Sequence, residues 1–476
     1  MTELAARLFA PRAPSLGAAG RWGASLLVLG LLALGLVDAF NSASVSLSLA
    51  LAGGVALTCF LALTITHYET AVAVGLLLMG VVRFEPAPPD IAFAVIVSVA
   101  AMTGRFRLNR VPLLLRWIVG LFLIVNVLSM VDVKVTSGAL HFLHITVYLA
   151  IFSLWLAGYV DSPSRSRTVV ITWLGVGAIS AVVSVLALNV PIPGRSFILG
   201  TVDNGERASG LFKDPNVFGP FLIPIAVILL EQRVSPRFPR PLRLRAFTTW
   251  ALLLALTLGI LFSYSRAAWG NFAIAVVVTL ATLSLRKSGA LRVLRAMALL
   301  LATAAVTITV LSAAGSIGFL EQRAHLQSYD VQRFSAQSFG WQLGWTHPLG
   351  VGPGQFEVLS PVASHSTFVR TFAEQGFVGL LLWVALLLVT LVLALRNVVL
   401  GRDTYGIGSA ALLGAWCGLI FNSVVVDTLH WRHLWVVAAL VWASTARRDA
   451  PNATPRSLSV GVVPRRQLAA ARLSWR

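Results

Sequence analysis

The stretch from Ser364 to Gly379 holds the residues whose types and spacing best suit chemistry. In it, His365 is followed by Ser366, nine further residues, Gly376, two residues and Gly379. An imidazole titrates near neutral pH, so it can accept the proton of a sugar hydroxyl as that hydroxyl attacks. A lone loop histidine is more often a polar surface residue, so His365 is a candidate only with its surroundings. We expect Ser364 to cap a helix whose first turn carries His365.

Three arginines lie in or beside the segments predicted to be outside the membrane. Arg207 and Arg266 fall at the ends of apolar segments, and Arg333 lies in the longest polar stretch. A guanidinium group stays charged and offers paired donors, so it suits phosphate oxygens. Each could instead pair with a lipid phosphate or a carboxylate, and for Arg333 both interpretations stay open.

The residues that follow Arg207 favour a local structural role. Lys213, Asp214 and Asn216 precede an apolar run, and Asp-Pro-Asn is typical of a helix start. We expect them to cap and close the mouth of that helix, with support of a neighbouring site as the alternative. The acids of the predicted outer segments lack paired metal-binding spacing, so we expect neither a divalent ion nor another cofactor. These acids are Asp132, Asp203, Glu206, Asp330 and Glu357.

A second polar cluster lies near the end of the apolar region. It consists of Asp427, His430, Arg432 and His433. The spacing could suit a metal, but charged groups at the end of a membrane helix also form interfacial turns. We interpret the cluster as such a turn.

The ordered set of motifs resembles the O-antigen ligase family, in which a histidine followed by Asn, Ser or Gln precedes a Gly-x-x-Gly turn by nine residues. Residues 207–219 resemble the family's Arg, Gly-Leu/Phe and Asp/Asn-Pro-Asn stretch, and 263–268 are similar to its Ser-Arg pattern. Arg333 and residues 347–356 resemble its Arg and Pro-Leu-x-Gly-x-Gly loop. The matches follow the family's order over roughly 207–379.

This resemblance implies transfer of a preassembled glycan from a polyprenyl (undecaprenyl) pyrophosphate carrier to an acceptor hydroxyl, at the outer face of a bacterial inner membrane. His365 would be the general base, and Arg207, Arg266 and Arg333 would bind the donor pyrophosphate. One displacement at the anomeric carbon would invert its configuration. The rate would fall as the pH drops through roughly 6 to 7, with a midpoint that nearby arginines could move downward. The supporting residues would be Lys213, Asp214, Asn216, Ser366, Gly376 and Gly379. The partners would be the lipid-linked donor, a lipid or glycan acceptor (lipid A-core in a Gram-negative envelope) and membrane lipids, without nucleic acid.

The composition assigns these residues to a helical membrane protein. Apolar residues make up 57% of the 476 and charged residues 12%, and the mean hydropathy of +0.83 exceeds that of water-soluble domains. Only helices satisfy the backbone of apolar runs that cross a bilayer. We therefore expect an all-α polytopic bundle of about 12–14 transmembrane helices. The candidate spans are 22–40, 45–65, 70–82, 90–103, 111–131, 139–160, 168–190, 211–230, 246–262, 267–285, 293–313, 376–395, 405–425 and 431–445.

The net charge of +19 is explained by topology. With the N-terminus inside, most of the 37 basic residues fall in cytoplasmic segments, as the positive-inside rule requires. The expected order is a cytoplasmic segment over 1–21 and transmembrane helices over 22–313 with an outer loop at 191–210. A long ordered outer loop over 314–375, transmembrane helices over 376–446 and a basic, disordered cytoplasmic tail over 447–476 follow.

Two kinds of alternative function remain. An O-antigen or polysaccharide polymerase, or a protein O-oligosaccharyltransferase, would use the same donor chemistry with another acceptor. A lipid-linked glycan transporter or flippase would place ionisable groups near the membrane midplane, often in inverted repeats. The polar groups of this sequence gather instead at the predicted outer boundary, which favours the transferase.

Overall fold

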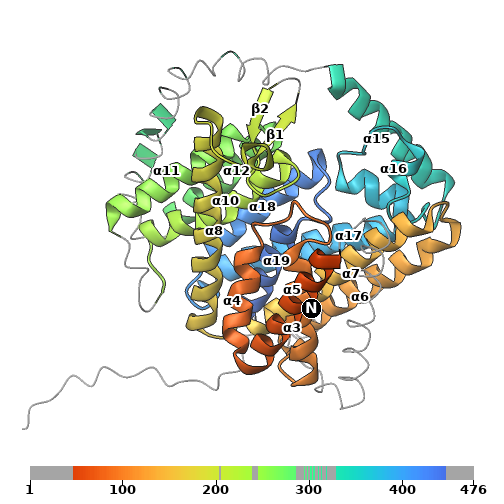
Figure 1. The fold of residues 1–476 in the computed structure, drawn as a ribbon, viewed down its shortest axis with the longest axis horizontal. Helices are drawn as coiled ribbons and strands as arrows, with labels where there is room; N and C mark the ends of the chain where they lie inside the picture. Colours follow the sequence, from red (N-terminus) through yellow and green to blue (C-terminus); the bar gives the residue numbers. More distant parts are fainter. Residues whose placement is uncertain are drawn as a thin grey trace, which may run out of the picture.

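The computed structural model describes residues 47–202, 205–238, 245–285 and 328–445, with isolated positions between 294 and 318. These residues form a bundle of helices with a short hairpin and a helical layer on one side (Figure 1). The larger helices are α3 (Leu47–Thr66), α4 (Tyr68–Leu78), α5 (Pro88–Met102), α6 (Leu113–Leu128), α7 (Thr136–Tyr159), α8 (Pro163–Asn189), α10 (Pro215–Val234), α11 (Ala246–Phe262), α12 (Arg266–Ser284), α15 (Ser328–Thr346), α17 (Thr367–Val399), α18 (Ser409–Val425) and α19 (Arg432–Ala443).

Six of the described helices are long and apolar enough to cross a membrane, and six shorter apolar helices accompany them. Within the described residues, each predicted span coincides with one of these helices. The predicted span 22–40 and the terminal segments 1–21 and 447–476 lie outside the described residues, and 293–313 is described only at isolated positions. The all-α polytopic membrane class is therefore confirmed.

One end of the bundle gathers the loops predicted to be cytoplasmic. Arg107 and Arg165 both pair with Asp161, at 2.6 and 2.9 Å. The amide of Gln232 donates a hydrogen bond of 2.7 Å to the carbonyl of Gly406. These contacts join turns that are separated by an even number of predicted spans, as helices that alternate in direction require.

The opposite end gathers the loops predicted to lie outside. Hydrogen bonds there join Arg83 to Phe197, Lys134 to Gln355, Arg207 to Ser263, Arg266 to Asp330 and Arg370 to Asp427. Every sequence-predicted site residue belongs to this end. Which end faces the outside of the cell stays a prediction from the charge asymmetry.

A two-stranded hairpin interrupts the helical pattern at this end. Strand β1 (Leu199–Val202) pairs antiparallel with β2 (Gly205–Ala208), with Gly200 opposite Arg207. The hairpin follows the short helix α9 (Arg195–Ile198) and lies against α8 and α10. The hairpin was not predicted from the sequence, because four-residue strands show too little periodicity to be recognised between apolar spans.

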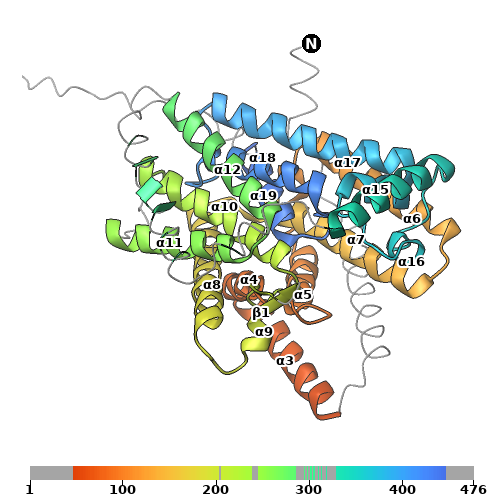
Figure 2. The same ribbon diagram turned by 90° about the horizontal axis from the view of Figure 1, so that it is seen from above.

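The long predicted outer loop is largely helical where it is described. Helix α15 and the short α16 (Phe356–Leu359) lie against α17 at one side of the bundle (Figure 2). Helix α17 begins at Thr367, nine residues before the predicted start of its span, and it is kinked at Gly376. The predicted boundary at 376 therefore marks the kink inside a longer helix.

Candidate active site

Arg207 lies on strand β2 of the hairpin, and its side chain reaches the start of α10. Its side chain is buried, with 1% of the residue exposed. Its Nε donates a hydrogen bond of 2.7 Å to the carbonyl of Ser263, and Nη2 donates one of 3.1 Å to Oδ1 of Asn216. This geometry joins the motif at 207–219 to the Ser-Arg motif at 263–268.

The start of α10 has the capping geometry that the sequence predicts. Asp214 is the N-cap residue, and its Oδ1 accepts a hydrogen bond of 2.8 Å from the backbone N–H of Asn216. Pro215 occupies the first turn, where its missing N–H costs nothing. Asp214 thereby positions Asn216, whose side chain accepts a hydrogen bond from Arg207.

Lys213 instead points to another segment and pairs with Glu85. Burial alone would raise the pKa of the Glu85 carboxyl, but the hydrogen bond and charge of Lys213 hold that pKa below its usual value. Residues 81–85 and 211–213 also meet through a backbone hydrogen bond between Val82 and Leu211. Lys213 therefore ties the loop before α5 to the mouth of α10.

Arg266 and Arg333 share a carboxylate. Nη2 of Arg266 donates a hydrogen bond of 2.6 Å to Oδ1 of the buried Asp330, and Nη1 of Arg333 lies 3.9 Å from the same oxygen. Arg266 stands in the first turn of α12, behind the N-cap Ser265. Both arginines therefore pair with a carboxylate, which was one of the two interpretations open from the sequence. The contact of Arg266 with Asp330 also holds the start of α15 against the start of α12.

His365 lies in the loop just before α17, in a left-handed backbone conformation with φ of 47°. Burial lowers the pKa of its imidazole to about 4, and the charge of Arg333 acts in the same direction. Asp214, Asp427 and Asp330 oppose that shift. The histidine therefore lies within electrostatic reach of the Arg333–Asp330 pair and of the cap of α10.

The local structure around His365 differs from the expected cap. Helix α17 begins at Thr367, and Ser366 holds the N-cap position without a side-chain capping bond. The Ser364 hydroxyl donates to the carbonyl of Ser366 at 3.3 Å. Ser364 therefore does not cap a helix that contains His365, and the histidine precedes the helix.

The glycines of the histidine signature have a positioning role. Gly376 adopts φ of 66° inside α17, and a Cβ there would collide with the carbonyl oxygen of Pro348. The N–H groups of Val351 and Gly352 donate hydrogen bonds of 2.9 Å to the carbonyls of Ala373 and Glu374. We call this contact between residues 348–354 and 373–376 the backbone clasp.

The backbone clasp explains why two distant glycine-rich motifs occur together. At Gly350, a Cβ would collide with the carbonyl of Glu374 across this contact, whereas at Gly379 it would collide with the Gln375 side chain of its own helix. The Pro-Leu-x-Gly-x-Gly loop and the Gly-x-x-Gly turn therefore interlock through their backbones. This contact fixes the first segment of α17, and with it the position of His365.

Sequence reasoning gave no site role to Asp330 or Arg370. The Asp330–Arg333 spacing of three residues on a helix is a signal that could have identified the shared carboxylate. Arg370 is buried and contacts Asp427 at 2.6 Å, Glu374 at 3.2 Å and Glu357 at 3.4 Å. Its partners come from three segments, so no spacing in the sequence reveals them.

The second polar cluster is held by partners of its own. Arg432 binds Asp90, with Nε 2.7 Å from Oδ1, and the ring Nε2 of His430 lies 3.0 Å from the Thr146 hydroxyl. Asp427 belongs to the Arg370 network. Within the described residues, no group of three or more His, Cys, Asp or Glu is arranged to hold a metal.

Residues 251–384 match the sequence model of a family described as O-Antigen ligase. The matched region contains Arg266, Arg333, His365 and the backbone clasp, while Arg207 and the cap of α10 precede it. No curated protein matches the chain. The family assignment indicates glycan transfer of the O-antigen ligase type, a glycosyltransferase-like activity in a membrane setting. The resemblance to the O-antigen ligase superfamily is thereby confirmed, and the chain carries an O-antigen ligase domain over residues 251–384.

Proposed function

We propose that the protein is a metal-independent, inverting glycosyltransferase that moves a preassembled glycan from a polyprenyl pyrophosphate, such as undecaprenyl pyrophosphate, to an acceptor hydroxyl. The observation that carries the proposal is that His365, at one end of the bundle, lies within electrostatic reach of the Arg333–Asp330 pair, whose carboxylate also binds Arg266. A base and a set of guanidinium groups are what displacement of a pyrophosphate requires.

His365 acts as the general base in this reaction. Since the pKa of His365 is about 4, its imidazole is neutral at pH 7 and can accept a proton. The acceptor O–H proton passes to the imidazole while the acceptor oxygen forms its bond to the anomeric carbon. The bond from that carbon to the pyrophosphate oxygen breaks, and the electron pair leaves with the pyrophosphate. One displacement inverts the anomeric configuration.

Arg207, Arg266 and Arg333 stabilise the departing pyrophosphate. When no glycan donor is bound, Arg266 and Arg333 both contact the carboxylate of Asp330. A bound pyrophosphate therefore has to share the arginines with that carboxylate or replace it. The burial of Arg207 and its bond to the Ser263 carbonyl fix one guanidinium in place before the donor arrives. Preformed charge of this kind costs no reorganisation during the reaction.

The proposed setting is the outer face of a bacterial inner membrane, because the site lies at the end that the charge asymmetry assigns to the outside. The acceptor is a lipid or glycan of the envelope, of lipid A-core type in a Gram-negative cell. A polymerase or a protein O-oligosaccharyltransferase would share the donor chemistry and differ in the acceptor.

Reconstitution tests the proposal. Purified protein in liposomes receives an undecaprenyl-pyrophosphate-linked glycan and a set of envelope acceptors, without ATP and with a chelator. We expect a glycosylated acceptor whose new linkage has the inverted anomeric configuration by NMR. Movement of the intact donor across the bilayer without a new linkage would contradict a transferase and identify a flippase, and retention of configuration would contradict the single displacement.

A further inference from the structure

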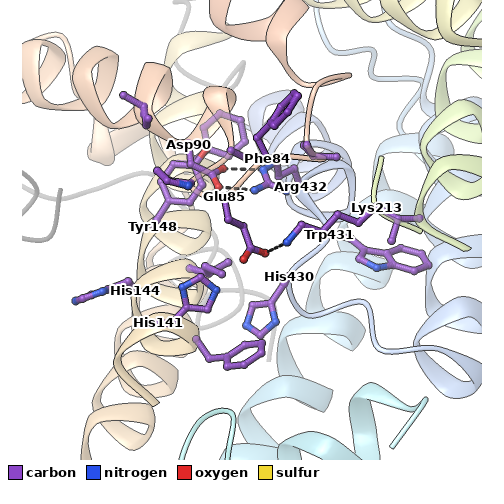
Figure 3. Close-up of a pocket in the computed structure, with 18 of the residues that line it drawn as sticks. Phe84, Glu85, Asp90, His141, His144, Tyr148, Lys213, His430, Trp431 and Arg432 are labelled. Atoms are coloured by element: carbon purple, nitrogen blue, oxygen red, sulfur yellow. Dashed lines mark hydrogen bonds and ion pairs between the residues drawn. The ribbon is translucent and has the colours of Figure 1, made fainter. Parts of the chain in front are cut away.

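A cavity of about 810 Å³ lies beside the candidate active site. Its walls come from the loop before α5, from α5 and α7, from the mouth of α10 and from the segment that joins α18 to α19. Figure 3 shows Glu85 reaching Lys213 and Asp90 reaching Arg432 at its wall, with His141 and His430 nearby. Its volume is within the range of pockets that enclose small ligands.

The charges of the cavity wall are paired with one another. Lys213 pairs with Glu85, Arg432 with Asp90, and Arg370 with both Asp427 and Glu357. The lining thus has three cations and four carboxylates, a formal net charge of −1 with neutral histidines. A wall of this charge repels a pyrophosphate, in contrast to the arginine group around Asp330.

The wall nevertheless offers hydrogen-bonding groups. Arg370 is 5% exposed and acts on the wall through its carboxylate partners Asp427 and Glu357, whose side chains are 20% and 43% exposed. His430 has its pKa lowered to about 3 by burial and by the charge of Arg370, so its ring is neutral. Carboxylate oxygens that accept hydrogen bonds and a neutral imidazole suit hydroxyl groups, which both donate and accept.

Aromatic side chains add apolar faces. Phe84, Phe142 and Trp431 line the cavity, and the guanidinium carbon of Arg370 lies 4.6 Å from the ring centroid of Phe142. Rings beside paired charges form an amphipathic wall that can cover the C–H faces of a sugar while polar groups bind its hydroxyls. The wall therefore fits a ligand that is rich in hydroxyls and carries no charge.

The cavity also borders the candidate active site. Asp427 lines the cavity, and its charge acts on His365. On another wall, Lys213 is followed directly by Asp214, whose charge also acts on His365. The hydroxyls of Thr367 and Thr428 lie 3.0 Å apart, so the segment that carries His365 adjoins the segment that carries Asp427.

We propose that this cavity binds an uncharged saccharide, held by the hydrogen-bonding groups and aromatic faces of its wall, next to His365. The inference rests on the proposed function and adds the substrate chemistry of a subsite that excludes the pyrophosphate. Such a saccharide could belong to the acceptor or to the glycan of the donor, and the experiment separates these two sources.

Gly138 allows the cavity to be filled without disturbing its charged network. It lines the cavity from α7, and a Cβ there would meet only Cγ1 of Val135, at 4.0 Å. Gly138→Trp therefore blocks the space, and Gly138→Ala tests the position itself. Gly120→Trp on α6 is the matched control, because a Cβ at Gly120 has nothing within 4 Å and this residue is not part of the lining.

The first measurement is saturation-transfer NMR on the purified full chain with maltotriose, mannotriose and the anionic trigalacturonic acid. We expect signals from a neutral trisaccharide with the wild type, Gly138→Ala and Gly120→Trp, and their loss in Gly138→Trp. Matching unfolding temperatures show that the Gly138→Trp variant is folded. Absence of neutral-saccharide signals in the wild type, stronger binding of trigalacturonic acid, or equal signals in folded Gly138→Trp would overturn the inference.

The second measurement is transfer kinetics in the reconstituted system. We expect Gly138→Trp to raise one KM at least about tenfold while Gly120→Trp leaves both unchanged. A rise in the acceptor KM identifies the acceptor as the source of the saccharide, and a rise in the donor KM identifies the donor glycan. Normal kinetics in Gly138→Trp would overturn the inference while the proposed function stands, whereas a wild type that binds saccharide but never transfers it would overturn the function alone.

Discussion

The acid side of the pH profile is the sharpest test of the role of His365. The pKa of its imidazole is lowered from 6.5 to about 4 by burial and by Arg333. At pH 5, about 90% of such an imidazole is neutral, against about 3% for a histidine with its ordinary pKa. Since only the neutral form accepts a proton, kcat/KM at pH 5 should stay close to its value at pH 7 and should fall as the pH drops through about 4.

Arg333→Gln perturbs this profile in a known direction. The arginine charge disfavours the imidazolium, so its removal raises the pKa of His365 and lowers the neutral fraction at pH 5. We expect a smaller ratio of kcat/KM at pH 5 to that at pH 7 in the variant than in the wild type. The ratio cancels any loss of donor binding that does not depend on pH. Arg195→Gln is the matched control, since Arg195 pairs with Glu206 on the same end of the protein.

The assay follows initial rates of glycan transfer at low donor concentration, between pH 4 and pH 8. Samples held at low pH and returned to pH 7 show that the protein stays folded. His365→Ala should lower the rate by about 10²–10⁴ at pH 7, while His347→Ala, in the turn after α15, should not. A wild-type midpoint near 6.5, or an unchanged pH ratio in Arg333→Gln, would refute the electrostatic reasoning. Full turnover in His365→Ala would refute the general-base role.

The remaining predictions concern the donor site, the kink and the topology. Arg207→Ala or Arg266→Ala should nearly abolish transfer, and lysine should rescue poorly because it lacks the paired donors; near-normal rates in both alanine variants would exclude the pyrophosphate role. Asp330→Asn should lower the donor KM, because a competing carboxylate is removed, and should lower kcat, because Arg266 loses the anion that orients it; kinetic constants unchanged from wild type would contradict both roles. Gly376→Ala should reduce the unfolding free energy by about 1–3 kcal/mol or more, measured by thermal unfolding of the detergent-solubilised chain, and an unchanged unfolding temperature would contradict the backbone clasp. A cysteine at Gln337 should react with a membrane-impermeant maleimide in intact cells, and labelling only after the membrane is opened would contradict the outer location of the site.

The helices were predictable from the sequence because a backbone in lipid must form its hydrogen bonds within the segment. A long apolar run therefore predicts a helix. The candidates His365, Arg207 and Arg266 were chosen because polar groups at the end of an apolar run stand out in the sequence, and their catalytic and binding roles stay predictions. Their location at one end of the bundle followed from counting spans. These successes depend on patterns that persist over many residues.

The failures depend on contacts between distant segments. The cap expected at Ser364 was wrong because α17 begins at Thr367, whose hydroxyl accepts a hydrogen bond of 2.7 Å from the N–H of the distant Thr428. The fall in rate was expected between pH 6 and 7, with nearby arginines as a reason for a lower midpoint. Burial and the charge of Arg333 together lower the pKa of His365 to about 4. Neither burial nor the partner Asp330 can be read from residue types along the chain.

The backbone clasp and the cavity wall differ in how many amino-acid substitutions they can accept. It is built from peptide groups and from glycines that admit no side chain, so few substitutions are compatible with it. Most of the cavity wall, in contrast, consists of side chains from α5, α7 and the neighbouring loops. If the proposed function holds, substitutions in the cavity wall would change which saccharides are accommodated while His365 keeps its position, so that one scaffold would serve different glycans.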